Sequence, residues 1–205
     1  MTQITFSAAD TDPRDNYGLL TGLVVPRPIA WVSTKGADGS LNLAPFSYFA
    51  AAASHPPSLM VSVGQRGGGP KDTLRNLQET REMVVHLVDQ ELVDEMNLSS
   101  GDWAYGESEI EKAGLSTIES MSVVAPRIAE AKVAMECRVV ELVPVAETRY
   151  TVAIAHVLQF HMEESLLIPG TKKPDPAKFQ PVSRLGGSNY GMIGDMFSRS
   201  RPDVR

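Results

Sequence analysis

Residues 27–49 read RPIAWVSTKGADGSLNLAPFSYF, two apolar stretches separated by a glycine-containing turn. The first stretch, Ile29 to Thr34, follows two prolines that favour extended backbone, and the second begins after Asp38-Gly39, a dipeptide typical of hairpin turns. We therefore predict a β-hairpin whose strand ends carry hydroxyl, amide and aromatic side chains. Pro45 has no backbone N–H to donate and is expected to bend the second strand.

A glycine-rich loop, Gly64 to Lys71, precedes a predicted helix with Asp72 as its N-cap. It does not match the phosphate loop of nucleotide hydrolases, because Pro70 stands where that motif requires lysine. The loop still offers backbone N–H groups, a helix N-terminus and the positive charges of Arg66 and Lys71, which favour a bound phosphate. A solvated loop ahead of a capped helix explains the same residues about equally well.

The remaining pattern is dominated by strands. Alternating apolar residues predict strands over residues 46–53, 58–64, 83–88, 131–143 and 151–162. Helical spacing predicts short helices over 89–98 and 107–113, while residues 1–26 are expected to form an entry loop and an edge element. The predicted fold is mainly β, a closed or partly closed antiparallel barrel with a few helices. We predict one domain over residues 1–205, with a loop-rich tail from about residue 166.

Composition narrows the functional classes. The formal net charge of −6 argues against a general nucleic-acid surface, since phosphate neutralisation requires clustered Lys and Arg. We expect no membrane association, because no apolar run approaches the ~20 residues of a membrane helix. Met1 to Ser7 lack the basic and apolar regions of a secretory signal, so a cytoplasmic location is expected.

A metal site is not expected. The single cysteine, Cys137, excludes a site built from several thiolates, and its place on an apolar strand face predicts an inert core residue. His156 shares a predicted strand face with apolar residues and is interpreted as a core histidine. His161 falls on the opposite face, so these two histidines do not chelate one ion.

Polar and aromatic residues gather along the predicted hairpin. Taken singly, the hydroxyl and amide residues Ser33, Thr34, Asn42 and Ser47 are better explained as turn caps. The aromatic residues Trp31, Phe46, Tyr48 and Phe49 are likewise better explained as core residues. Together with the loop before Asp72, however, they indicate a site for a planar ring with an anionic end.

These residues carry a family resemblance. The matching segments, in order, are Arg27 to Thr34, Asn42 to Phe49, Pro56-Pro57, Lys71-Asp72-Thr73, Met83 to Asp89, Ser108 to Gly114, Glu136-Cys137-Arg138 and Arg184 to Gly187 with Tyr190. Together they span roughly residues 20–190, and the chain resembles the flavin reductase-like proteins of the FMN-binding split-barrel class, which include flavoredoxin-type proteins. The resemblance implies an antiparallel split β-barrel, non-covalently bound FMN, and a homodimer with the flavin near the subunit boundary.

The resemblance also implies site residues by position. Those expected to line the isoalloxazine ring and ribityl chain are Trp31, Ser33, Thr34, Asn42, Leu43, Ala44, Pro45, Phe46, Ser47, Tyr48 and Phe49. Those expected around the phosphate are Ser62, Gly64, Arg66, Lys71, Asp72 and Thr73. No catalytic side chain is nominated, because flavin itself accepts the electrons. His86 is a departure, since the family more often has Asn there.

The function favoured on this basis is an FMN-dependent oxidoreductase that takes hydride from NADH or NADPH. Its electrons would pass to free flavin, a protein partner or a small organic acceptor. Two alternatives stay open: a flavin-binding electron carrier that needs a separate reductase, and a purely structural dimerisation module. No Rossmann fingerprint is present from which to infer the nicotinamide preference.

Overall fold

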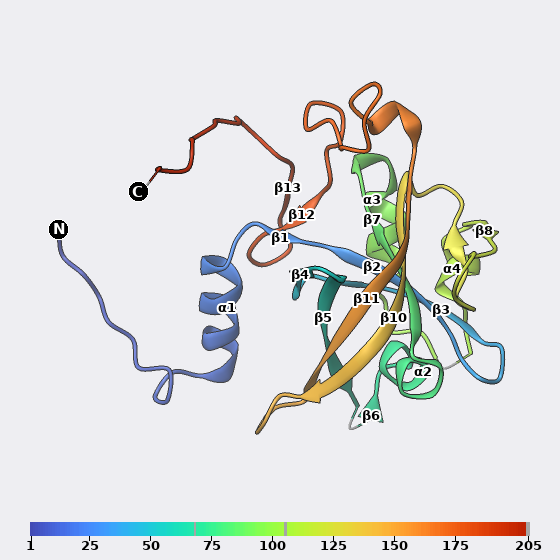
Figure 1. Ribbon diagram of the computed structural model, residues 1–205. Coiled ribbons are helices and arrows are strands. Elements are labelled where there is room, and N and C mark those ends of the chain that lie inside the picture. Colours follow the sequence, from blue (N-terminus) through green and yellow to red (C-terminus); the bar gives the residue numbers. More distant parts are fainter. Residues whose placement is uncertain (68, 105, 204–205) are drawn as a thin grey trace.

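The chain forms an antiparallel β-barrel that is open along one side, with helices at its rim and flank (Figure 1). The computed structural model describes residues 1–67, 69–104 and 106–203, and for Arg66 the backbone alone. The main sheet has the strand order β3-β2-β7-β10-β11-β5-β4, with β6 paired to β5. Because β3 and β4 end this order without pairing to each other, the barrel is split, and the predicted fold class is confirmed.

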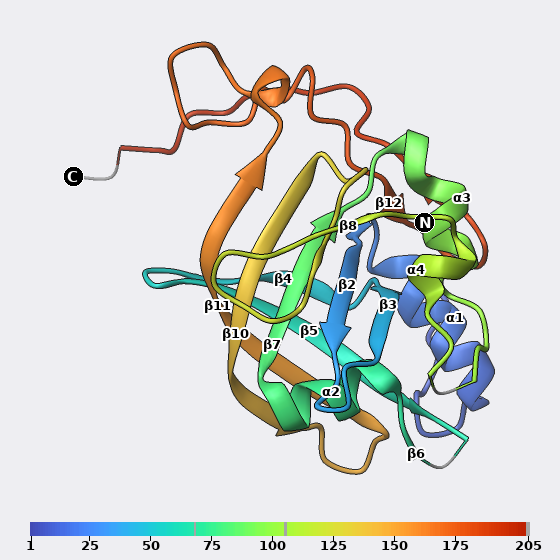
Figure 2. The same cartoon turned by 90° about the vertical axis from the view of Figure 1, so that its right-hand side faces the viewer.

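The strands of the main sheet agree closely with the sequence pattern. They are β2 (Ala30–Lys35), β3 (Leu41–Phe46), β4 (Phe49–Ser54), β5 (Pro57–Arg66), β6 (Gly69–Pro70), β7 (Glu82–Leu87), β10 (Val133–Pro144) and β11 (Tyr150–Met162). The β2–β3 hairpin pairs Thr34 with Asn42, and Gly39 takes a positive φ of 88° in its turn, as the Asp-Gly dipeptide predicts. In Figure 2 the strands β11, β10, β7, β2 and β3 lie side by side in this order.

Short strands and helices complete the chain. The minor sheets contain β1 (Arg27–Pro28), β12 (Ser183–Arg184) and β13 (Tyr190–Gly191), and β8 (Thr117–Ile118) paired with β9 (Arg127–Ile128). The helices are α1 (Pro13–Leu23), α2 (Asp72–Thr80), α3 (Val93–Leu98) and α4 (Glu109–Lys112), with 3-10 turns η1 (Gln90–Leu92) and η2 (Glu164–Leu166). Among the described residues, none of these helices has the length and apolar character needed to cross a membrane.

Two apolar clusters hold the barrel together. One fills its interior and includes Val32, Val61 and Val85, all without solvent exposure. The other lies between the outside of β2 and β3 and the helices α3 and α4, with Trp31 and Leu43 at its centre. Strand β2 is therefore buried on both faces, which explains why the run of residues 29–32 is apolar without alternation.

One prediction for the N-terminal part is wrong. Residues 13–23 form α1 instead of a loop and an edge element, because the Asp12 side chain accepts a hydrogen bond from the Arg14 amide (2.8 Å) and Pro13 begins the helix. Pro45 lies inside β3, where it pairs with Trp31. An edge strand tolerates this proline, since its missing N–H faces away from the sheet.

The interpretation of His156 as a core residue is also wrong. The small side chains of Ala153 and Ala155 face the barrel interior, while His156 is half-buried on the outer face beside Ser58 (Nδ1 to Oγ, 3.0 Å). Bulkier apolar residues on that outer face, such as Phe160, are exposed. The interior between β5 and β10 accepts only small residues from β11, so the bulkier face points outward.

Candidate functional site

The segment Asn42–Ala50 separates two cavities. A polar pocket of about 170 Å³ lies at the free edge of β3 and is lined by Asn42, Ala44, Pro45, Pro70, Lys71, Asp72, Thr73, Ser99, Ser100, Gly101, Trp103 and Glu109. An apolar pocket of about 360 Å³ lies under α1 and is lined by Leu20, Val24, Arg27, Ser47, Tyr48, Phe49, Ala50, Met60, Ser62 and Val152. The predicted site residues that line a cavity are thus divided between these two pockets. The start of the segment Asn42–Ala50 lines the polar pocket, and its end lines the apolar pocket.

The polar pocket contains the N-terminus of α2. Lys71 is the N-cap of this helix and Asp72 its first residue, so the helix begins one position earlier than predicted. Among the described residues, no side-chain capping hydrogen bond is present at Lys71. The Lys71 ammonium lies 5.7 Å from the centre of the Phe46 ring, and the Asp72 carboxylate pairs with Arg75 at 3.2 Å. Helix N–H groups and a lysine on one wall suit an anion.

Buried hydrogen bonds between polar side chains support this wall of the polar pocket. The Asn42 amide donates a hydrogen bond to the Thr73 hydroxyl (2.9 Å), and the Asn76 amide donates to the Thr34 hydroxyl (3.0 Å). These bonds join the end of the β2–β3 hairpin to α2 and fix the helix N-terminus beside β3. Thr34 has no solvent exposure, so it supports the wall and does not line the pocket.

Three other predicted residues lie beneath the site. Trp31, Ser33 and Leu43 have no solvent exposure and line neither pocket. The Trp31 indole N–H donates to the Ser99 hydroxyl (2.8 Å), which belongs to the pocket wall, and the Leu43 amide donates to the Glu109 carboxylate (3.0 Å). Ser33 donates to the Pro126 carbonyl (2.5 Å). Trp31 and Leu43 thus hold Ser99 and Glu109, which line the polar pocket, whereas Ser33 bonds to a residue that lines neither pocket.

The apolar pocket is closed by a buried arginine and an aromatic pair. Arg27 donates to the carbonyls of Thr21 and Val24 at the end of α1, and to that of Leu185 at 3.0 Å. The rings of Tyr48 and Tyr150 stack with centroids 5.8 Å apart, and burial together with Tyr150 raises the pKa of Tyr48. This pocket therefore offers a mainly apolar surface, to which Arg27, Ser47, Tyr48 and Ser62 add polar groups.

Of the residues predicted around the phosphate, Ser62 and Gly64 do not line the polar pocket. Ser62 lines the apolar pocket instead. Gly64 packs beneath Tyr150, where an added Cβ would come 3.1 Å from the ring. The side chain of Arg66 lies outside the described residues, as does Gly68 within the same loop.

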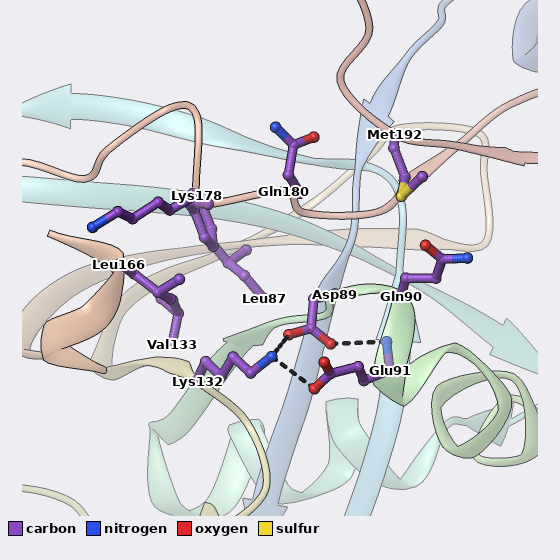
Figure 3. A pocket seen from close by; sticks show the side chains of 11 residues that line it. Leu87, Asp89, Gln90, Glu91, Lys132, Val133, Leu166, Lys178, Gln180 and Met192 are labelled. Carbon is purple, nitrogen blue, oxygen red and sulfur yellow. Dashed lines mark hydrogen bonds and ion pairs between the residues drawn. The ribbon is translucent and has the colours of Figure 1, made fainter.

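A third cavity, of about 450 Å³, contains none of the predicted residues (Figure 3). It lies between the end of β7 and the C-terminal tail, and Lys132 forms ion pairs there with Asp89 (2.8 Å) and Glu91 (2.7 Å). These two carboxylates raise the pKa of Lys132 above its usual value. The charge of Lys132 is thus already balanced by neighbours, and in Figure 3 the Lys178 ammonium points away from this ion pair.

Comparison with known proteins agrees with the fold. Residues 22–172 match the model of the flavin reductase like domain. The chain belongs to the flavin reductase-like family. An uncharacterized protein of Halalkalibacterium halodurans is 40% identical over 196 residues, which is 93% of each chain. The family resemblance inferred from the sequence is confirmed.

Solved structures of family-like proteins superpose over nearly the whole chain. Nitrilotriacetate monooxygenase component B from Bacillus cereus has a TM-score of 0.93 and 36% identity, covering 97% of this chain and 100% of that one. The 2-nitrobenzoate 2-nitroreductase of Pseudomonas fluorescens has a TM-score of 0.88 and 29% identity, covering 97% and 96%. The similarity therefore includes α1 and the C-terminal tail, beyond the matched domain.

Sequence reasoning missed the wall formed by the loop Ser99–Trp103 and by Glu109. These residues face Lys71 and Thr73 across the polar pocket of this flavin reductase-like chain. One signal was available, since Trp103 is a large aromatic residue in an otherwise polar loop. Its position opposite α2 depends on how α3 and α4 pack against β3, which local pattern does not reveal.

His86, the departure from the family pattern, is a buried link between two segments. It has no solvent exposure; its Nδ1 lies 3.0 Å from the Trp31 carbonyl, and its Nε2 accepts a hydrogen bond from the Ile128 amide (2.9 Å). The Ile128 bond requires a lone pair on Nε2, so the proton is on Nδ1. Burial lowers the pKa of His86 to about 4. The residue is a neutral structural bridge between β2, β7 and β9.

Cys137 agrees with its prediction as an inert core residue. It is fully buried, and burial raises the pKa of its thiol to about 12. His161 contacts the buried carboxylate of Glu136 (2.7 Å). Among the described residues, no group of three or more His, Cys, Asp or Glu side chains is placed to hold a metal ion.

Proposed function

We propose that this chain is an FMN-binding oxidoreductase that uses NADH or NADPH as electron donor and acts as a homodimer. The observation that carries the proposal is the polar pocket, where Lys71, the Thr73 hydroxyl and the N-terminus of α2 converge beside β3. This is a suitable site for the phosphate of a mononucleotide. Family membership supports the same ligand class.

The residues present fit the parts of FMN. The phosphate is assigned to Lys71, Thr73 and the first N–H groups of α2, with Asn42 fixing Thr73. The polar chain of the cofactor then follows Ala44 and Pro45, and the ring faces the segment Phe46–Phe49. When bound, FMN supplies two-electron redox chemistry, which no side chain of the protein provides. The protein's own part is to bind, orient and shield the ring.

The homodimer is supported by apolar surface on one side of the chain. Tyr17, Leu20 and Leu23 project from α1 at helical spacing and are 60%, 54% and 78% exposed. This stripe continues into the apolar pocket, which Leu20 lines together with Val152 of β11. An exposed apolar surface of this kind favours contact with a second copy of the chain. That copy would also cover the ring-binding segment Ser47–Phe49.

The acceptor class is drawn from the similar structures. One is component B of a nitrilotriacetate monooxygenase and another is a 2-nitrobenzoate 2-nitroreductase. For this chain we propose free flavin, a protein partner or a small organic molecule as acceptor. We also propose a cytoplasmic setting, where nicotinamides are available and the thiol of Cys137 stays reduced.

The test is an anaerobic titration of the FMN-loaded protein with NADH and with NADPH, followed by visible absorbance. We expect the oxidised flavin band to disappear with one nicotinamide, and turnover to begin when an acceptor is added. A yellow protein that neither nicotinamide reduces, but that a separate reductase does, would replace this function with that of an electron carrier. A protein that takes up no FMN in excess would overturn the proposal.

A further inference from the structure

The indole of Trp103 forms the outer wall of the polar pocket and is in contact with several neighbouring groups. The Trp103 N–H donates to the Leu98 carbonyl (3.2 Å), and the Lys112 ammonium lies 5.1 Å from the centre of the Trp103 ring. Lys112 is itself held by Glu107 at 3.1 Å. Trp103 is partly exposed, and these contacts hold its ring in the lining of the polar pocket.

Gly101 keeps the indole close to the loop. A Cβ at position 101 would come 2.9 Å from Nε1 of Trp103 and 3.1 Å from the Leu98 carbonyl oxygen. The indole therefore packs directly against the glycine backbone. Beneath the loop, Ser99 is buried and bonded to both the Trp31 indole (2.8 Å) and the Met96 carbonyl (2.7 Å). The wall is thus supported from the core and does not rest on a free loop.

The pocket behind this wall is small. Its volume of about 170 Å³ is below the roughly 300–1,000 Å³ of sites that enclose a whole drug-sized ligand. It therefore accepts the end of a ligand and not a complete nucleotide. Its lining comes mainly from three places: β3, the start of α2 and the loop Ser99–Trp103.

These walls restrict what can be attached to a bound phosphate. If the phosphate lies at Lys71 and Thr73 and its chain follows Ala44 and Pro45, the loop with Trp103 forms most of the remaining described lining, beside Pro70 and Glu109. A second phosphate with its adenosine would have to pass that indole. We propose that Trp103 is a specificity-determining residue that limits the site to a flavin mononucleotide and excludes the flavin dinucleotide. This inference rests on the FMN-binding function proposed above.

The experiment is calorimetric titration of the apoprotein with FMN and with FAD, for wild type, Trp103→Ala and Trp103→Phe. We expect wild type to bind FMN about tenfold or more tightly than FAD, and Trp103→Ala to reduce that preference about tenfold through tighter FAD binding. Trp103→Phe, which keeps a smaller ring in place, should reduce it by a few-fold. Phe6→Ala, an exposed aromatic residue away from both pockets, is the matched control and should keep the wild-type preference.

The outcomes separate the two proposals. Absence of binding for both flavins in wild type would overturn the FMN-binding function itself. Normal FMN binding with equal FAD affinity, or a preference unchanged in Trp103→Ala, would overturn the role of Trp103 alone. A Trp103→Ala variant that loses FMN affinity without gaining FAD affinity would also overturn it, by making Trp103 an FMN contact. Should thermal melting show that Trp103→Ala is unfolded, an unchanged preference in Trp103→Phe decides against the inference.

Discussion

At the scale of single residues, Lys71 gives the clearest test of the phosphate site. Lys71→Ala should weaken FMN binding by about 1–3 kcal/mol, the usual effect of losing a charge-assisted hydrogen bond. Riboflavin has the same ring and chain but no phosphate, so its affinity should be almost unchanged. Titrating both ligands into wild type and variant measures the difference directly. Lys178→Ala, in the third cavity, is the control. An equal loss for FMN and riboflavin would contradict the assignment of Lys71 to the phosphate.

His86 makes stability depend on pH. Its pKa of about 4 in the folded chain lies below the 6.5 of a free imidazole, so the unfolded chain takes up this proton first as the pH falls. The neutral ring therefore contributes fully to the free energy of unfolding above pH 6.5. This contribution declines as the pH falls from 6.5 to 4 and does not change further below pH 4. The total loss between pH 6.5 and 4 is about 3 kcal/mol.

The measurement is urea unfolding of wild type and His86→Asn at pH 7.5 and 4.5. Other groups titrate in both proteins, so the quantity of interest is the difference between their losses of stability. Wild type should lose more, because Asn has no proton to take up and its side chain offers both a donor and an acceptor to the Trp31 carbonyl and Ile128 amide. Equal losses would show that His86 is not the titrating group.

At the scale of elements, α1 depends on one side chain for its position. Arg27 is 6% exposed and donates to the Thr21 and Val24 carbonyls, which the end of a helix leaves without intrahelical partners. Arg27→Met keeps much of the side-chain volume but removes these donors, so it should cost about 1–3 kcal/mol and loosen α1. Hydrogen exchange of the amides of residues 13–23 should then be faster. Arg14→Met, on the exposed side of the same helix, should leave exchange unchanged. Equal protection in both variants would refute this role of Arg27.

The elements also show what local sequence determines. The β2–β3 hairpin and the β10–β11 pair follow from alternation and turn chemistry, and both are confirmed. Helix α1 was missed because the apolar run from Leu19 to Val25 suggested an edge element, although Asp12-Pro13 is a good helix start. Within the site, Lys71, Thr73 and Asn42 were predicted and meet in one pocket, whereas the Ser99–Trp103 wall was not. That wall forms through contacts between segments far apart in the sequence, such as Trp31 with Ser99, which are separated by 68 residues, and no local pattern encodes them.

At the scale of the whole molecule, the outward face of β11 and the exposed apolar stripe of α1 adjoin each other at the apolar pocket. The barrel interior takes Ala153 and Ala155, so the bulkier residues of β11 face outward, with Phe160 66% exposed. Leu20 and Val152 join this face to α1 in the apolar pocket. The same surface borders the segment to which the flavin ring is assigned. Dimer formation and FMN binding should therefore be linked.

Leu23→Asp tests this link, since Leu23 is 78% exposed on α1 and a carboxylate there would be desolvated in a dimer interface. We expect wild type to elute with twice the mass of one chain in size-exclusion chromatography with light scattering, and Leu23→Asp to shift towards a single chain and bind FMN more weakly. Ile118→Asp places the same charge on β8, on the opposite side of the molecule from α1 (Figure 1), and should keep the wild-type mass.

A wild-type protein of single-chain mass at every concentration would refute the homodimer. A Leu23→Asp variant that stays dimeric would instead move the interface away from α1. Weaker FMN binding in a Leu23→Asp protein that remains dimeric would show that α1 affects the cofactor site within one chain, because the partner would then still be in place.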